Sequence, residues 1–234
     1  MPHSPLLGLQ ALIHVTVAPG AAINSGTIGF GLGPRINAAG RLDDAMTAVK
    51  LLTAQELENA RELAEELNSA NQERQALSQK IFEEAGTPAG SQGSPEWSLV
   101  LGEEGWHPGV IGIVASRMTE KYHLPSVLLS IDGDTAKGSC RSIPPLDLYQ
   151  ALDRCRDHLV QFGGHAQAAG LTIKTAEIPA FRDAFSQVVA EMLDHKPYEP
   201  AAEPDWFVPE GREITPEAVE QLGKLEPSGW GTRL

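Results

Sequence analysis

An uninterrupted helical pattern from Gln55 to Ala85 constrains the fold of this chain more than any other stretch. No proline or glycine occurs within it, and apolar residues recur at alternating steps of three and four. The stripe consists of Ala60, Leu63, Leu67, Ala70, Leu77 and Ile81, with Arg74 in its polar gap. The pattern predicts a long helix with a narrow apolar stripe. Such a helix either bridges two lobes or packs along one domain, and both arrangements remain open.

Strands alternate with helices after a linker at residues 86–95, which is rich in glycine, proline and serine. Strands are expected at 97–101, 125–131 and 168–174, with a third strand end or loop at 136–142. Helices are expected at 110–122, 146–162 and 178–193. This order predicts an α/β fold, a mixed or parallel sheet with flanking helices. Ligands of such sheets bind at loops beyond the strand ends, where the sequence places His107, Ser139, Arg141 and His165.

A cationic segment, Gly33 to Arg41, precedes the long helix. It carries Arg35, Asn37 and Arg41 among small residues and contains no acid. The glycines and alanines predict a loop whose backbone another molecule can approach closely. Asp43 and Asp44 are expected to cap a short helix beginning near Ala45. The segment is either an anion site at a helix start or a tight turn whose arginines pair with nearby acids.

The two ends of the sequence are less regular than its middle. Leu6 to Ile13 could form a helix or a strand and has no obvious packing partner in the chain. Trp206 to Val208 could form a strand, and Ile214 to Leu225 is expected to be a short helix capped at Thr215. Both ends are expected to be cut from something larger.

Composition limits the class of protein. The chain has 234 residues, enough for one large or two small domains, and a formal net charge of −13. That charge argues against a chain coated by nucleic acid, although it does not show where the charges lie. No apolar run reaches membrane-spanning length. Cys140 and Cys155 lack metal-ligand spacing, which favours a reduced, cytoplasmic protein.

Several catalytic chemistries lack their motifs. His107 and His165 have no accompanying ligands at metal-binding spacing, and Ser139 lacks a nucleophile elbow. The glycine-rich run Gly29 to Gly33 matches neither the dinucleotide nor the Walker pattern. Glycine loops that carry Arg, Ser, Asn and His remain, and these suit phosphate oxygens or a nucleic-acid backbone. Loops that merely close an α/β domain are nearly as good an interpretation.

Three segments together resemble the RecJ single-stranded-DNA exonucleases of the DHH phosphoesterase superfamily. Their order and spacing also match, including the long helix after the first segment, and the resemblance covers about Thr27 to Leu193. The segments are GFGLGPRINAAGRLDDA, GEEGWHPGVIGIVASRMTEKY, and GSCRSIPPLDLYQAL with FGGHAQAAGLTI. The tail through LEPSGWG resembles the opening of the OB-type domain that follows in this family.

The resemblance implies a domain order. Residues 1–53 would be the end of the metal-bearing DHH domain, and 54–96 the connecting helix and linker. Residues 97–195 would be the DHH-associated α/β domain, and 196–234 the start of the OB-type domain. The family cuts single-stranded DNA from its 5′ end with Mn2+ or Mg2+ and acts in DNA repair and recombination. No Asp-His-His triplet occurs here, so we expect a portion that binds the strand, holds no metal and is inactive alone.

The resemblance also assigns roles to individual residues. Arg35 and Arg41 would hold backbone phosphates, with Asn37 orienting their loop, and His107 and Arg117 belong to the second motif. Contacts to the terminal phosphate would come from Ser139, Arg141 and Ser142, in a pocket shaped by Gly163, Gly164 and His165. The expected partner is single-stranded DNA, bound by a monomer, with a single-strand-binding protein or a helicase as further candidates. The alternatives are a non-catalytic binding module and a DHH-family phosphodiesterase of short oligonucleotides.

Overall fold

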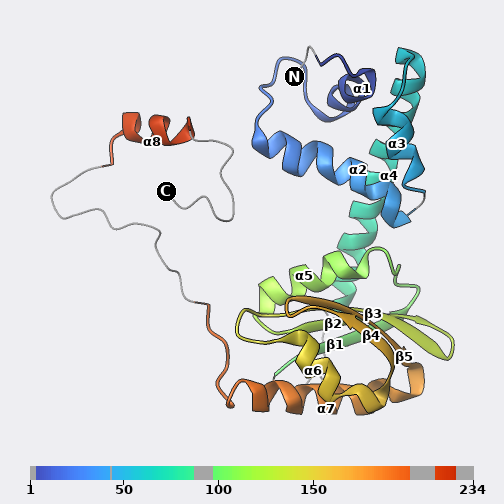
Figure 1. Ribbon diagram of the computed structural model, residues 1–234, viewed down its shortest axis with the longest axis vertical. Coiled ribbons are helices and arrows are strands. Elements are labelled where there is room, and N and C mark those ends of the chain that lie inside the picture. The colour runs from blue at the N-terminus through green and yellow to red at the C-terminus, as the bar shows by residue number, and fades with distance from the viewer. Residues whose placement is uncertain (1–3, 43, 87–96, 201–213, 225–234) are drawn as a thin grey trace. The chain divides into compact units, whose positions relative to one another are not determined.

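The computed structural model describes residues 4–42, 44–86, 97–200 and 214–224 (Figure 1). The chain divides into two compact units. The helical unit contains residues 1–37, 47–68 and 200–234, and the sheet unit contains residues 38–46 and 69–199. None of the described helices is long and apolar enough to span a membrane.

The N-terminal helix α1, Leu7–Thr16, packs closely against α3, Met46–Leu52. A side chain at Gly8 would place its Cβ 1.8 Å from the carbonyl oxygen of Leu51, so only glycine permits this approach. Leu12 and Leu51 are both fully buried. The segment therefore has a packing partner within the chain, contrary to the expectation from its sequence.

The segment expected to be a cationic loop is a helix. A π-helix, η1, spans Thr27–Leu32 and continues directly into α2, Gly33–Leu42. Pro34 lies in the first turn of α2, where proline is tolerated, and Ala38 and Ala39 are buried. Ala38 and Ala39 are helix formers whose burial outweighs the flanking glycines. The helix cap expected after this segment is confirmed, because the Met46 amide donates to Asp44 Oδ1 at 2.9 Å.

Helix α4, Leu57–Ala85, confirms the long helix. Its most buried positions are Ala60, Ala64, Leu67, Asn71, Ser78, Ile81 and Ala85. The expected stripe shares Ala60, Leu67 and Ile81 with this set, whereas Leu63, Ala70 and Leu77 are only half-buried. Residues up to Asn68 belong to the helical unit and those from Ser69 to the sheet unit, so α4 contributes to both.

The sheet unit is built on a mixed five-stranded sheet in the order β1-β2-β3-β5-β4, which confirms the expected α/β class. Strands β1 and β2 are parallel and every other neighbouring pair is antiparallel. The strands are β1 Leu99–Glu104, β2 Ser126–Asp132, β3 Thr135–Arg141, β4 Leu159–Gly164 and β5 Ala168–Lys174. The helices are α5 Ile111–Tyr122, α6 Leu148–Arg154 and α7 Ile178–Met192, with short 3-10 helices at Arg156–His158 and Thr175–Glu177.

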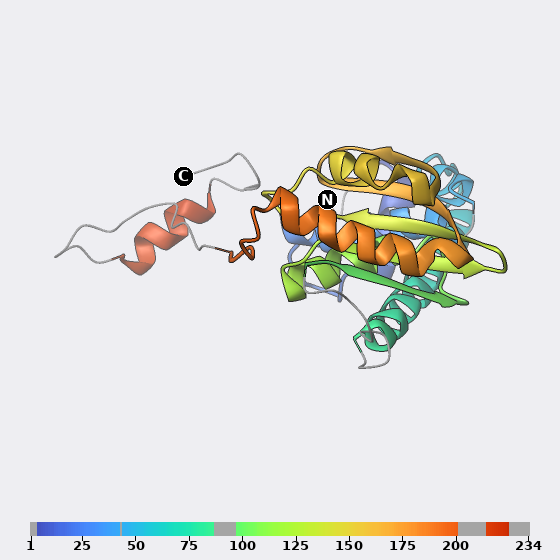
Figure 2. The ribbon, with the colours of Figure 1, turned by 90° about the horizontal axis from the view of Figure 1, so that it is seen from below.

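Alternating strand residues build a core on each face of the sheet. On one face Leu101 and Leu128 pack with Val114 and Met118 of α5, together with the last turns of α4. On the other face Val127, Leu129 and Cys140 pack with α6 and α7, including Phe181 and Phe185. Figure 1 shows α5 on the opposite side of the sheet from α6 and α7, and Figure 2 shows α7 running along its face.

The helix expected at 146–162 is wrong in its second half. Asp147 caps α6 by accepting from the Gln150 amide at 3.0 Å, but the helix ends at Arg154. Residues 159–164 instead form β4, whose Phe162 pairs with Leu171 of β5. Gly163 and Gly164 disfavour a helix, and pairing with β5 satisfies the backbone of an apolar segment that borders the core.

The C-terminal expectations are tested only in part. Helix α8, Pro216–Gly223, confirms the short helix, and the Ala218 amide donates to Thr215 Oγ1 at 3.2 Å. The strand expected at 206–208 and nearly all of the expected linker lie outside the described residues.

Two adjacent glycines at the end of β4 provide a matched test of this fold. Gly164 has φ +152°, and an added Cβ would lie 2.4 Å from the Ala168 carbonyl oxygen. A Cβ at Gly163 meets no atom within 4 Å. We expect Gly164→Ala to lower the free energy of unfolding by about 1–3 kcal/mol and Gly163→Ala to leave it nearly unchanged. Urea denaturation of both variants measures this difference, and equal stabilities would contradict the described turn.

Candidate phosphate-binding site

Successive side chains of β3 point to opposite faces of the sheet. Ala136 and Cys140 enter the core beneath α6 and α7. Lys137, Ser139 and Arg141 therefore project from the opposite face, the one that α5 covers in part. This alternation places a hydroxyl and a guanidinium beside the N-terminal half of α5.

Arg141 is held in place by oxygen atoms that carry no charge. Its Nε donates to Ser116 Oγ at 3.1 Å. Its Nη1 donates to Ser139 Oγ at 3.2 Å and to the Cys140 carbonyl oxygen at 2.8 Å. Ser116 in turn donates to the Gly112 carbonyl oxygen at 3.2 Å. These bonds fix the guanidinium without neutralising it.

Gly112 on α5 makes room for this arrangement. A Cβ at this position would lie 2.9 Å from Ser139 Oγ and 3.1 Å from Arg141 Nη2. Any larger residue would push the strand and the helix apart or displace the guanidinium. Gly112 and Ser116 are four residues apart and so lie on the same face of α5.

The electrostatic environment of Arg141 favours an anion. No carboxylate forms an ion pair with it in the part of the chain that the structure describes. Burial is the main reason that its pKa lies below the ordinary value, and the positive charge of Arg41 lowers the pKa further. The guanidinium nevertheless stays protonated, because an arginine pKa is so high. A half-buried cation without a counter-charge gains free energy when an anion binds.

Arg41 lies at the end of α2 against the loop that leads into α5. Its Nη1 donates to the Gly109 carbonyl oxygen at 3.2 Å. A Cβ at Gly109 would lie 2.0 Å from the Arg41 carbonyl oxygen, so the two backbones are in close contact. His107 shapes this loop, since its Nδ1 accepts from the Gly109 amide at 3.1 Å. Arg41, His107, Ser139 and Arg141 therefore border the same end of α5.

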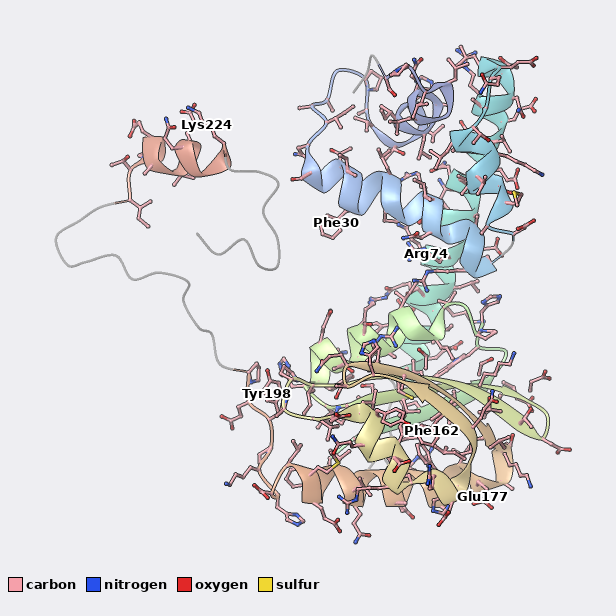
Figure 3. The ribbon with its side chains drawn as sticks, in the orientation of Figure 1. Phe30, Arg74, Phe162, Glu177, Tyr198 and Lys224 are labelled. Atoms are coloured by element: carbon pink, nitrogen blue, oxygen red, sulfur yellow. The ribbon has the colours of Figure 1, made fainter. Side chains whose placement is uncertain are left out.

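A groove of about 550 Å³ lies on the sheet next to Ser139. Gly163 and Gly170 face each other across β4 and β5 and leave the strands bare of side chains there. Phe162, labelled in Figure 3, is a further lining residue and its ring lies 5.6 Å from that of Tyr149. The other lining residues are Pro108, Ile111, Lys137, Gly138, Gln161, Leu171 and Thr172. The groove combines apolar walls with hydroxyl, amide and ammonium groups.

Other residues singled out from the sequence have different contacts. Ser142 Oγ donates to the Leu146 carbonyl oxygen at 2.8 Å and so stabilises the turn before α6. Gly164 forms the β4–β5 turn, and His165 is exposed, with Nδ1 accepting from the Gln167 amide at 3.3 Å. Arg117 stacks on Phe82 of α4 at 3.9 Å from the ring centroid and donates to Gln79.

Arg35 and Asn37 belong to the helical unit. Arg35 donates to Asn68 Oδ1 at 3.0 Å and to the Gly31 carbonyl oxygen at 2.9 Å. Asn37 lies on α2, so the expectation that it orients a loop is wrong, because the segment is helical. Arg35 and Arg41 lie on one helix, about 120° apart around its axis, and not together on a loop.

The sequence interpretation missed two residues of this site, Gly112 and Ser116. Both lie in the segment GVIGIVASRM, whose charged residue Arg117 is the more conspicuous candidate by residue type. The available signal was the pair of small residues four positions apart on a predicted helix, which marks a face that a neighbouring strand can approach. That pairing identifies the helix face but does not specify the strand.

The described residues do not fit a resident metal ion. They contain no group of three or more His, Cys, Asp or Glu side chains that could hold one. Burial raises the pKa of the Cys140 thiol to about 12 and that of the Cys155 thiol to about 11, so neither is a ready thiolate ligand. Mn2+ or Mg2+ is therefore not assigned to any residue described above.

Comparison with known proteins identifies relatives over nearly the whole chain. The DHHA1 domain family matches residues 97–191. The chain is 38% identical over 225 residues to the single-stranded-DNA-specific exonuclease RecJ of Bacillus subtilis (strain 168), which covers 95% of this chain and 28% of that protein. It is 39% identical over 196 residues to the RecJ exonuclease of Escherichia coli (strain K12), covering 80% of this chain and 34% of that protein.

A solved structure has the same fold. The crystal structure of RecJ in complex with Mg2+ from Thermus thermophilus matches with a TM-score of 0.82 and 33% identity. The match covers 98% of this chain and 35% of that one. The chain thus spans about a third of the length of these relatives. With a DHHA1 domain at residues 97–191 and similarity to these exonucleases along most of its length, the chain belongs to the RecJ family.

Proposed function

We propose that this chain provides the strand-binding part of a 5′ to 3′ single-stranded-DNA exonuclease that acts in DNA repair and recombination. Arg141 and Ser139 hold the phosphate of the terminal nucleotide, and Arg41 adds positive charge beside them. The observation that carries the proposal is the fixed Arg141 guanidinium, which has three oxygen partners and no carboxylate among the described residues.

The chemistry of these groups suits a phosphate. A guanidinium carries five N–H donors, and the bonds described above use those of Nε and Nη1. The two N–H groups of Nη2 remain to donate to phosphate oxygen. Ser139 Oγ accepts from Arg141 and retains its own proton to donate to a third oxygen. Such contacts hold and orient the strand end but carry no information about base sequence.

The neighbouring groove is the proposed position of the nucleotide itself. Its bare strands at Gly163 and Gly170 allow a flat base or a sugar to approach the backbone. Pro108 and Ile111 provide apolar contact, whereas Gln161 and Thr172 provide hydrogen-bonding groups. A groove of this composition accepts any base, because apolar contact does not depend on base identity.

The rest of the activity is proposed by analogy with the family. In the complete enzyme a divalent ion, Mn2+ or Mg2+, would activate water and neutralise the phosphoryl charge. The groups that hold such ions would lie outside the described residues, and the residues above would position the strand. The protein would act in the cytoplasm as a monomer, with a single-strand-binding protein or a helicase as partners.

Replacement of Arg141 tests the phosphate contact. We expect Arg141→Ala to weaken binding of a 5′-phosphorylated strand about tenfold to hundredfold, because hydrogen bonds to a charged group are lost. A strand with a 5′ hydroxyl should bind nearly as before. Fluorescence anisotropy across a low-salt series measures both, and loss of one phosphate contact should make the log–log salt slope shallower by about 0.7.

Arg156→Ala is the control for this experiment. It removes the same charge from an exposed arginine that pairs with Asp153 at 2.9 Å and lies after α6. Its effect on both strands should be small. If Arg141→Ala and Arg156→Ala change the preference for a 5′ phosphate equally, or if the unmodified chain has no such preference, Ser139 and Arg141 only stabilise the fold.

Filling the groove tests the position of the nucleotide. An added Cβ at Gly163 meets open space, so Gly163→Val should fold normally and place its methyl groups in the groove. We expect strand binding to weaken about fivefold or more, because the valine methyl groups would occupy space that the nucleotide needs. The free energy of unfolding should be unchanged. Gly163→Ala should have a smaller effect on the same titration. Unchanged binding by the valine variant would exclude this groove.

A nuclease assay distinguishes strand binding from strand cleavage. The 234-residue sequence contains no Asp-His-His triplet, so the proposal assigns the metal-holding groups to another part of the complete enzyme. This chain should therefore bind a 5′-labelled strand without degrading it in Mn2+. Degradation that co-purifies with the chain and stops in EDTA would contradict that assignment.

A further inference from the structure

The buried stripe of α4 becomes polar where it passes the end of α2. Asn71 is 2% exposed and Ser78 is 5% exposed, and Arg74 lies between them on the same face of the helix. Apolar residues occupy the equivalent positions further along, such as Ile81 and Ala85. Burial of polar side chains in the middle of a helix costs stability unless each finds a partner.

Arg74 has fewer partners than its burial requires. Its Nη2 donates to Asn71 Oδ1 at 3.0 Å. Its Nε is buried and has no hydrogen-bond acceptor in the described part of the chain. No described carboxylate forms an ion pair with it. A buried N–H donor that belongs to a charged group and has no acceptor destabilises the folded state.

A second cation lies close to Arg74. Residues 38–46, which include Arg41, cluster with the second half of α4 in the sheet unit, and Leu42 packs against the core that contains Ile81. Burial lowers the pKa of Arg74, and the positive charge of Arg41 lowers it further. Figure 3 labels Arg74 on this part of α4.

Arg41 is common to two repulsive pairs. Its positive charge acts on Arg74 and also on Arg141. The geometry agrees, because Arg41 Nη1 contacts Gly109 one turn before Gly112, beside which Arg141 lies, and Leu42 packs against the core that contains Ile81 of α4. None of the described carboxylates forms an ion pair with these arginines. Two repulsive pairs that share Arg41 are retained at a cost to stability, and a multiply charged anion would reduce that cost.

We propose that Arg74 is a specificity-determining residue that selects a terminal phosphate monoester over the phosphate diesters within a strand. It acts with Arg41 and Arg141 and responds to the second negative charge of the monoester. The inference rests on the proposed function, because it assumes that Arg141 binds the terminal phosphate.

Charge is the property that separates the two kinds of phosphate. An internal diester carries one negative charge, whereas a monoester at about pH 8 carries two, because its second pKa is about 6. Arg141 with Ser139 satisfies a single charge equally well in either group. A second guanidinium nearby, whose Nε is already buried without a partner, adds attraction for the second charge of the monoester.

The test compares three strands that differ only at the 5′ end. They carry a hydroxyl, a methylphosphate with one charge, or a phosphate with two, and each has a fluorophore at the 3′ end. The protein is the 234-residue chain at about pH 8 and low salt. We expect the unmodified chain to bind phosphate about tenfold more tightly than methylphosphate, as one additional charged hydrogen bond predicts.

Arg74→Met, which keeps an unbranched apolar stem but removes the guanidinium, should abolish the tighter binding of the phosphate strand over the methylphosphate strand. The variant should still bind the methylphosphate strand more tightly than the hydroxyl strand, because that difference depends on Arg141. Arg74→Lys, which keeps the charge, should restore most of the lost preference and also serves if the methionine variant does not fold. Arg61→Met, on an exposed part of the same helix, is the matched control and should change neither preference.

The outcomes separate the inference from the function on which it rests. The charge of Arg74 does not select the monoester if the Arg74→Met variant still binds the phosphate strand more tightly than the methylphosphate strand by the full factor. The same conclusion follows if Arg74→Lys loses this preference as completely as Arg74→Met does. If Asn71→Ala abolishes the same preference without loss of the arginine, Arg74 acts only by packing against its neighbour. If the unmodified chain does not distinguish hydroxyl from either phosphate, the proposed function fails first.

Discussion

The contact between Gly112 of α5 and the end of β3 is the constraint on which the candidate site depends. The absence of a side chain at Gly112 allows the helix to lie against Ser139 and Arg141. Ser116, one turn further along α5, then reaches the Arg141 guanidinium. The parallel β1–α5–β2 connection fixes where the helix crosses the sheet, and the antiparallel β2–β3 register fixes which β3 residue meets it. A shift of β3 by one residue would exchange Arg141 for the buried Cys140.

Repulsion among the arginines of the candidate site destabilises the folded chain, and a bound anion would reduce that repulsion. Arg41 repels both Arg74 and Arg141, and none of the described carboxylates forms an ion pair with these arginines. The chain as a whole carries a net charge of −13. Its acids therefore lie elsewhere, for example in the exposed ion pairs Arg154–Glu191 and Arg156–Asp153. This separation of charge concentrates a positive potential at one end of α5 while leaving the net charge unfavourable for non-specific DNA binding.

The sequence predicts what depends on local pattern and fails where tertiary pairing decides. Periodicity identified the helices α4 and α7, because each buries one face over many residues, and apolar runs identified β1, β2 and β5. It missed β4, whose backbone is satisfied by β5 and not by its own turns, and it mistook α2 for a loop because glycines flank its alanines. The candidate site divides in the same way. Arg141 and Ser139 are recognisable by residue type, whereas Arg74 appears in the sequence only as a gap in an apolar stripe, and its interaction with Arg41 depends on tertiary structure. No local rule indicates which cations a fold will bring together.

The position of β4 at the margin of the sheet affects how the groove can respond to an occupant. Among the described strands β4 pairs with β5 alone, and its register is irregular between Leu159 and Gln161. One wall of the groove is thus attached by a single ladder of hydrogen bonds, whereas the opposite wall at β3 is held from both sides. Local opening of an edge strand requires less free energy than opening of a central one. An occupant of the groove would therefore meet a rigid side at β3 and a more compliant side at β4 that can adjust to its width.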